Sequence, residues 1–181
     1  MGLSLADIEK LFSDHGHIEY SGEGVSQLEH SLQAAHLAEA EGAGDELVTA
    51  AFLHDLGHLL NRQGETPTAR GIDDQHQYFA IPFLRPLFRP AVIEAIRLHV
   101  DAKRALCALE PGYYEALSED SKRSLELQGG IFDEPGLKAF LDKPGASDAM
   151  RVRRWDDLAK VPGASTAPIG HYLEIAARCA S

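Results

Sequence analysis

An apolar segment in the first half of this chain is interrupted by three titratable side chains, His54, Asp55 and His58. On a helix these residues share one face with Ala51, while the neighbouring faces carry leucines. Ionisable groups are costly to bury unless something compensates them, and a metal ion is the usual compensation. The alternative is an exposed face on which histidines occur by chance, but the surrounding leucines favour burial. The segment therefore predicts a helix that lines a metal site.

Further candidate ligands lie on other predicted helices. Taken singly, each is more often a structural residue than a ligand. Together with His54 and Asp55 they make a set of nitrogen and oxygen donors with no cysteine nearby. Imidazole and carboxylate donors suit iron, manganese or zinc, and the lack of thiolates argues against a structural zinc site. These additional candidates are His30, His76, His99 and Asp156.

Apolar residues recur at helical spacing along most of the chain, and the alternation typical of strands is nearly absent. Ser26 and Glu29 form the pattern of a capping box and predict a helix that begins there. Asp45 is expected to cap the next helix, which would run through the histidine segment to about Leu60. The sequence thus predicts an all-α helical bundle, and residues 1–181 are expected to form a single domain. The other expected elements are a loop at 61–74 and helices at about 5–12, from 75 to the prolines at 86 or 90, and at 90–100, 118–127, 135–141, 150–158 and 169–177.

Composition excludes several classes of function. The 181 residues include 17 basic and 28 acidic side chains, and the formal net charge of −11 argues against general nucleic-acid or anionic-membrane binding. No apolar run approaches the roughly 20 residues that span a bilayer, and the first residues lack the pattern of a secretory signal. The two cysteines, Cys107 and Cys179, form no CxxC pair or disulfide framework. We therefore expect a cytoplasmic protein with no membrane, nucleic-acid or obligate protein partner.

The order of the candidate ligands, with His54-Asp55 at its centre, resembles the HD-domain pattern of metal-dependent phosphohydrolases, and His58 extends it to HDxxH. A longer match is more specific, because over about residues 11–172 the chain resembles the PhnZ-type HD-domain oxygenases. The segments that carry this resemblance are Tyr20–Glu23, Gln27–Gln33, Leu53–His58, Gln75–His76, His99–Arg104, Gln128–Gly130, Asp133–Glu134 and Arg154–Asp156.

The resemblance implies an HD-domain helical bundle with a dinuclear metal site in its core and a mixed-valent pair of iron ions, Fe(II)/Fe(III). It implies an enzyme that uses O₂ to cleave the C–P bond of 1-hydroxy-2-aminoethylphosphonate, giving glycine and phosphate. A sister branch acts on the trimethylated ammonium compound and gives glycine betaine. The stretch 63–74 departs from the aminophosphonate pattern, so both substrates stay open.

The resemblance also implies roles for individual residues. Tyr20 would be a catalytic ligand that leaves the second iron when substrate arrives, and Glu23 would pair with the substrate ammonium. The implied ligands of the first iron are His30, His54, Asp55 and Asp156. The second iron would be held by His76 and His99, with Asp55 as the bridge. The implied phosphonate-side residues are the catalytic His58 and the binding residues Lys103, Ser121, Gln128 and Arg153.

Spacing alone supports one of these roles. Lys103 lies four residues after His99, so on a helix it can reach an anion bound at the second iron. Its plainer interpretation is a solvated lysine beside Arg104.

Two other hypotheses use the same residues. An HD phosphohydrolase would use the metals to activate water against a phosphate ester or nucleotide. Tyr20 and Glu23 argue against it, since a hydrolase has little use for a displaceable phenolate. A non-catalytic HD module that binds a signalling nucleotide would have no need of the six ligand candidates.

Overall fold

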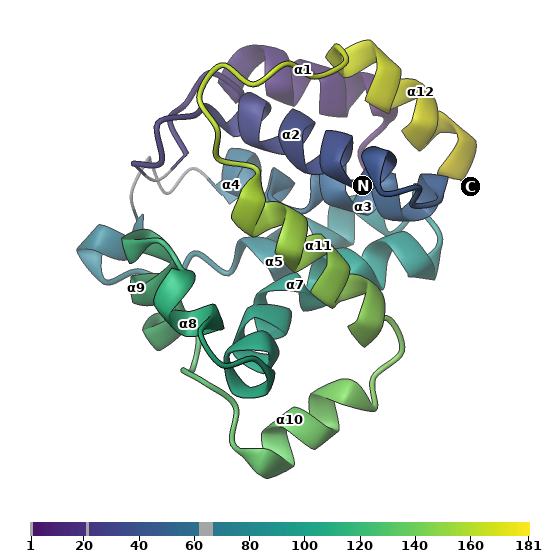
Figure 1. The fold of residues 1–181 in the computed structure, drawn as a ribbon. Coiled ribbons are helices and arrows are strands. Elements are labelled where there is room, and N and C mark those ends of the chain that lie inside the picture. The colour runs from purple at the N-terminus through teal and green to yellow at the C-terminus, as the bar shows by residue number, and fades with distance from the viewer. Residues whose placement is uncertain (1, 21, 62–66) are drawn as a thin grey trace.

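The computed structural model describes residues 2–20, 22–61 and 67–181, and these residues are mainly helical (Figure 1). Extended pairing among them is limited to two isolated bridges, Glu19 with Ser26 and Phe88 with Ala180. The all-α prediction is confirmed. The α-helices are α1 (Leu5–His15), α2 (Gln27–Ala40), α3 (Asp45–Leu53), α4 (Leu56–Asn61), α5 (His76–Phe79), α6 (Ile81–Leu84), α7 (Pro90–Leu109), α8 (Tyr113–Ala116), α9 (Glu119–Leu127), α10 (Glu134–Leu141), α11 (Ala146–Leu158) and α12 (Ile169–Cys179).

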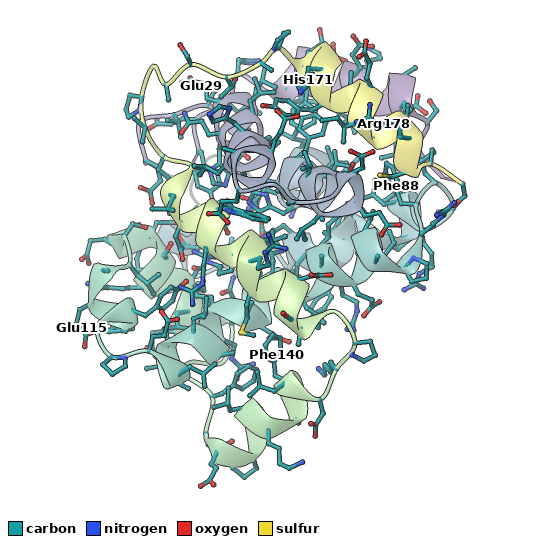
Figure 2. All side chains as sticks on the ribbon, turned by 45° about the vertical axis from the view of Figure 1, so that its right-hand side comes forward. Glu29, Phe88, Glu115, Phe140, His171 and Arg178 are labelled. Atoms are coloured by element: carbon teal, nitrogen blue, oxygen red, sulfur yellow. The ribbon has the colours of Figure 1, made fainter. Side chains whose placement is uncertain are left out.

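The centre of the molecule is a bundle of α2, α3, α7 and α11, in which α7 packs against both α3 and α11. In Figure 1, α1 and α12 cover one end of this bundle and α10 lies at the other. A large apolar cluster that includes Phe52, Trp155 and Tyr172 fills the first end. A smaller one lies around Leu98 and Phe140, and Figure 2 labels Phe140 where α10 meets the bundle. The burial of these apolar side chains is the main source of stability, at roughly 25 cal/mol per Å².

The helix ends follow the sequence signals closely. The capping box of Ser26 and Glu29 is present at the start of α2, and Ser118 accepts from the amide of Ser121 at the start of α9. Asp45 is not a cap, because Gly44 is the N-cap residue of α3, and the Asp45 carboxylate instead accepts from the Arg178 guanidinium at 2.8 Å.

Helices α11 and α8 are among the segments that differ from the prediction. Helix α11 begins at Ala146, ahead of the predicted start at 150. The four-residue helix α8 was not predicted; it follows Gly112, whose φ of 86° is a turn conformation that favours glycine.

The prediction of one helix from Asp45 to about Leu60 is wrong. Helix α3 ends at Leu53, and His54 and Asp55 lie in a turn before α4. The ring of His54 donates from Nδ1 to the carbonyl of Ala51 at 2.7 Å, so a side chain engages that acceptor. Helix α4 then packs on α5 so closely that a Cβ on Gly57 would lie 2.0 Å from the carbonyl oxygen of His76. Glycine is therefore required at this contact.

The region after α4 is divided more finely than predicted. Within the expected loop, Pro67–Arg70 forms a 3₁₀ turn, whereas residues 62–66 lie outside the described part of the chain. The single helix expected from residue 75 is two short helices, α5 and α6, and Pro82 lies in the first turn of α6. A proline has no amide hydrogen to donate, which suits that position.

Cys107 and Cys179 are both free thiols. Within the described residues, no helix combines the length and apolarity needed to cross a membrane.

Candidate metal centre

Four side chains from three parts of the bundle meet in its interior and form the first cluster. His30 comes from α2, His54 and Asp55 from the turn after α3, and Asp156 from α11. All four are at most 2% exposed. The Nε2 atoms of His30 and His54 lie 3.1 Å apart. Each of them lies 3.1–3.5 Å from the nearest carboxylate oxygens of Asp55 and Asp156.

The hydrogen bonds of the two histidines fix which nitrogen faces the cluster. His30 donates from Nδ1 to the carbonyl of Ala159 at 2.7 Å, and His54 donates from Nδ1 to Ala51 at the same distance. Because a carbonyl only accepts, Nδ1 carries the proton and Nε2 of the neutral ring is a lone pair. Two lone pairs facing each other at 3.1 Å repel, unless a cation lies between them. Metal–nitrogen bonds of about 2.0–2.1 Å fit such a separation.

A second cluster shares Asp55 with the first. It contains His76, at the start of α5, and His99, in the middle of α7. Their Nε2 atoms lie 3.2 Å apart and 3.1 and 3.4 Å from Asp55 Oδ1. His99 donates from Nδ1 to the carbonyl of Ile96 at 2.7 Å, and His76 donates from Nδ1 to Asp74 at 2.9 Å. The same tautomer therefore directs both Nε2 lone pairs inward.

Asp55 has the geometry of a bridging ligand. Its Oδ2 faces His30 and His54, whereas its Oδ1 faces His76 and His99. Both oxygens are buried, and neither has a hydrogen-bond partner within the described residues. An unpartnered buried carboxylate is strongly unfavourable. Two metal ions, one on each oxygen, would satisfy it, so the residues fit a dinuclear site.

The electrostatics of the clusters also call for cations. Burial would raise the pKa of Asp55, but His54 and His58 outweigh it and hold that pKa well below its usual range. Burial would likewise raise the pKa of Asp156, and Arg153 and His54 keep it well below its usual range. Burial lowers the pKa of His54, yet Asp55 and Asp156 raise it well above its ordinary value. In the absence of metal, protons on the histidines supply the charge that the carboxylates require.

The paired histidines of the second cluster divide that role. Burial lowers the pKa of His76, but Asp55 outweighs burial and raises that pKa to about 9. Burial lowers the pKa of His99 to about 4. In the absence of metal, one proton therefore lies between the Nε2 atoms of His76 and His99 at neutral pH, where a metal ion would bind.

The second cluster opens on a cavity of ≈ 40 Å³ through His76, whereas the first meets that cavity only through its carboxylates, Asp55 and Asp156. His76 is 7% exposed, whereas His30 and His54 are fully buried. Glu23 is absent from the cavity wall. The residues with predicted roles that line the cavity are Tyr20, Asp55, His58, His76, Lys103, Ser121, Gln128, Arg153 and Asp156.

His58 stands on the cavity wall beside the second cluster. Its ring stacks on that of His76, with centroids 4.0 Å apart, and its Nε2 lies 3.8 Å from Asp55 Oδ1. The Nδ1 of His58 donates to Asp74, which also accepts from His76. Asp74 thus holds a ligand and a cavity histidine together. The sequence analysis gave it no role, although its position two residues before His76 was the available signal.

Tyr20 lies nearer to the first cluster than the resemblance implied. Its ring stacks on that of His30, with centroids 3.9 Å apart, and its hydroxyl donates to Asp156 Oδ1 at 3.4 Å. Burial and the neighbouring Asp156 raise the pKa of this phenol well above its usual value. A cation bound between the ligands would oppose that shift. The expected contact was with the second iron, which His76 and His99 would hold.

A buried lysine lines the same cavity as the histidines. Lys103 is 1% exposed; its Nζ donates to Ser124 Oγ at 2.6 Å and lies 3.4 Å from the carbonyl of Ser121. Burial, together with nearby Arg153, lowers the pKa of Lys103 to about 7. The interpretation of Lys103 as a solvated surface residue is therefore wrong. Gln128 presents a buried Oε1 without a hydrogen-bond partner in the described chain.

Arg153 is engaged with aspartates. Its guanidinium lies 2.9 Å from Asp156 Oδ2, and its Nε donates to Asp157 at 3.0 Å. It reaches the hydroxyl of Ser121 only at 3.5 Å. The contacts hold Asp156 in place, so Arg153 acts first as a support for a ligand of the first cluster.

Glu23 has a partner that the sequence analysis missed. Its carboxylate lies 3.4 Å from Nζ of Lys160, just after the end of α11. Lys160 could not be recognised in the sequence, because it lies 137 positions from Glu23 and no sequence motif connects the two residues.

An all-helical bundle whose buried histidines and aspartates form two clusters around one shared aspartate defines a metal-binding helical domain. The HD domain matches residues 28–132, which is more than half of the chain, and the protein therefore belongs to the HD-domain family.

Relatives that cover nearly the whole chain place it more narrowly. A hydroxymethylphosphonate dioxygenase from Gimesia maris is 42% identical over 172 residues, 94% of this chain and 85% of that protein. A [1-hydroxy-2-(trimethylamino)ethyl]phosphonate dioxygenase (glycine-betaine-forming) from Leisingera caerulea is 34% identical over 168 residues, 93% of this chain and 86% of that protein. An uncharacterized protein, L432, of Acanthamoeba polyphaga mimivirus is 32% identical over 170 residues, 93% and 78% of the two chains. Within the HD family, the chain thus groups with the phosphonate dioxygenases.

Proposed function

We propose that this protein is a dinuclear iron dioxygenase that cleaves the C–P bond of a 1-hydroxyphosphonate. The observation that carries the proposal is Asp55, whose two unpartnered oxygens face two histidine pairs, one of which opens on a cavity that Lys103 and Arg153 also line. The names of the two dioxygenase relatives support the same activity. We also propose that residues 1–181 act as one domain, since α1 and α12 pack on the same apolar cluster as α3.

Nitrogen and carboxylate donors without thiolates suit iron in its two common oxidation states. His30, His54, Asp55 and Asp156 would hold one iron, and Asp55, His76 and His99 the other. When bound, the irons would supply the redox chemistry that O₂ requires.

The overall reaction needs no further reductant. A 1-hydroxyphosphonate and O₂ contain the atoms of one carboxylic acid and one phosphate. The C–P bond breaks, one oxygen atom goes to carbon and the other to phosphorus. The four electrons that reduce O₂ come from the C–H and C–P bonds of the substrate. Hydroxymethylphosphonate would give formate, and the trimethylamino compound would give glycine betaine.

The protein's own residues bind and orient the substrate. Lys103, Ser121 and Gln128 line the cavity and would receive the phosphonate oxygens, with Lys103 supplying the charge. His58 donates from Nδ1 to Asp74, so its Nε2 is free to accept the proton of the substrate hydroxyl. Tyr20, stacked on His30, covers the first cluster and shields it from water.

Oxygen consumption tests the proposal. Iron-loaded protein should consume O₂ and release phosphate from hydroxymethylphosphonate or its trimethylaminoethyl analogue in a 1:1 ratio. The competing HD phosphohydrolase would release phosphate from an ester without O₂ under anaerobic conditions. Anaerobic ester hydrolysis, with no O₂ uptake on any 1-hydroxyphosphonate, would establish that alternative instead.

A further inference from the structure

A lysine lies behind the cavity wall, in contact with two of the residues that line it, Ser121 and Tyr20. The Nζ of Lys160 is 3.4 Å from the carboxylate of Glu23, 3.4 Å from the hydroxyl of Ser121 and 3.5 Å from that of Ser118. It also lies 5.7 Å from the centre of the Tyr20 ring, in a cation–π arrangement. The side chains of Lys160 and Glu23 are only 13% and 15% exposed, so the pair is largely shielded from water.

The charges of Glu23 and Lys160 already balance each other. A carboxylate with so little exposure requires a cation close by. Here the chain itself supplies the cation from Lys160. A substrate with an ammonium group would bring a second positive charge to a carboxylate that is already neutralised, and would meet Lys160 as a like charge.

We propose that Lys160 determines the substrate class, because it occupies the place of a substrate cation beside Glu23. The site then takes 1-hydroxyphosphonates without a cationic substituent, and hydroxymethylphosphonate is the smallest of them. This inference rests on the proposed function and makes it more specific.

Three cations converge on one serine of the cavity wall. The Nζ of Lys103 is 3.4 Å from the Ser121 carbonyl, while Arg153 and Lys160 reach its hydroxyl at 3.5 and 3.4 Å. The other acidic residues that line this wall are engaged. Asp120 pairs with Arg123, Asp74 holds His58 and His76, and Asp73 accepts from the amide of Gln75. Such surroundings favour a compact anion over a zwitterion.

The size of the cavity agrees with a compact substrate. A volume of ≈ 40 Å³ holds about three water molecules, since each needs roughly 10–15 Å³ of such space.

The experiment compares kcat/KM for hydroxymethylphosphonate and 1-hydroxy-2-aminoethylphosphonate. Wild type should prefer the first compound by at least about tenfold. Lys160→Met should shrink that preference at least about tenfold, because it leaves Glu23 as an uncompensated carboxylate that an ammonium can neutralise. The control is Lys138→Met, which removes the lysine of an exposed ion pair with Asp142, 3.0 Å long, on α10. It should leave the preference unchanged.

A second readout does not depend on turnover. Dissociation constants of the two compounds, measured anaerobically on metal-loaded protein, should shift in the same direction. Thermal unfolding checks that Lys160→Met folds. The double variant Glu23→Gln/Lys160→Met removes both charges and should bind hydroxymethylphosphonate within about threefold of wild type.

Each outcome is decisive. A wild-type preference for the aminoethyl compound overturns the inference and leaves the proposed function standing. A preference that stays within twofold in Lys160→Met also overturns it. If neither compound causes O₂ uptake or phosphate release, the proposed function fails, while the ratio of dissociation constants still tests Lys160.

Discussion

The two clusters that share Asp55 are built differently. In the first cluster, both histidines are held by backbone carbonyls at 2.7 Å, and all four side chains are at most 2% exposed. In the second cluster, His76 lies on the four-residue helix α5 and donates to the side chain of Asp74 instead of a backbone carbonyl. The second cluster offers three protein donors and faces the cavity.

The difference in burial and ligand number suggests that one cluster retains a metal and the other binds the substrate. Closed sites with a full set of protein ligands hold a metal, whereas sites with fewer ligands leave positions for substrate. We therefore expect the first cluster to retain its metal and the second to receive the substrate. Among the described side chains, Asp55 alone is shared by the first and second clusters, so its loss should abolish the difference between them.

The largest expected effect is therefore that of Asp55→Ala. Both proposed metals should be lost, and activity should fall below detection, because four histidines would face each other without the shared carboxylate. Stability should fall as well. Metal analysis and thermal unfolding measure these changes, and Asp142→Ala, at an exposed surface carboxylate, is the control. An Asp55→Ala protein with two bound irons would contradict the bridging role.

Removing one histidine from each cluster should separate them. His30→Ala opens a cavity under the ring of Tyr20 in a fully buried site, so it should cost roughly 3 kcal/mol of stability. His76→Ala should cost less, because His76 is partly exposed. Each variant should retain about one metal per chain.

Chemical rescue makes the comparison sharper. Free imidazole should restore activity to His76→Gly, whose vacated position opens on the cavity, but not to His30→Gly, whose position is enclosed. Equal rescue of both variants would show that the clusters do not differ in access.

The sequence predicted which histidines and aspartates cluster better than it predicted the helices that carry them. His30, His54, His76 and His99 could be found because titratable residues in apolar segments need a reason to be there. The break between α3 and α4 could not be predicted, because residues 53–55 contain no glycine or proline that would mark a helix end.

The residues that the sequence analysis missed owe their roles to long-range contacts. Lys160 meets Glu23 across 137 positions, and Ser124 meets Lys103 across 21. Lysines and serines are common on surfaces, and only packing shows which of them face a cavity. The same reason explains why Arg153 was placed on the phosphonate side, although its bonds go first to aspartates.

A smaller effect is expected from Lys103→Met, which tests the open side of the second cluster. The methionine fills similar space without charge, so metal content should stay unchanged. The loss of one charge-assisted contact should weaken phosphonate binding by about 1.5–3 kcal/mol, or roughly 10- to 150-fold. Anaerobic titration measures the affinity. Unchanged affinity at low ionic strength would remove Lys103 from the binding site.

The smallest expected effect is a pH dependence that belongs to the open side alone. The pKa of Lys103 is lowered to about 7 by burial and by Arg153, so its charge is present below pH 7 and is lost as the pH rises through that value. The attraction for a phosphonate should fade in the same direction, by at most about tenfold per pH unit.

The phosphonate gains negative charge over the same range, which opposes this trend, so the useful quantity is the ratio of wild-type to Lys103→Met affinity. The titration of the ligand cancels in that ratio. The ratio of wild-type to Lys103→Met affinity should fall between pH 6 and 9. The ratio of Lys103→Arg to Lys103→Met affinity should stay constant, because a guanidinium remains charged throughout. Any change in metal content over this range should be the same in all three proteins, because each keeps His76, whose pKa of about 9 falls at its upper end. A wild-type ratio as flat as that of Lys103→Arg would mean that bound phosphonate keeps Lys103 protonated, and would move the pH-sensitive step to another group of the cavity.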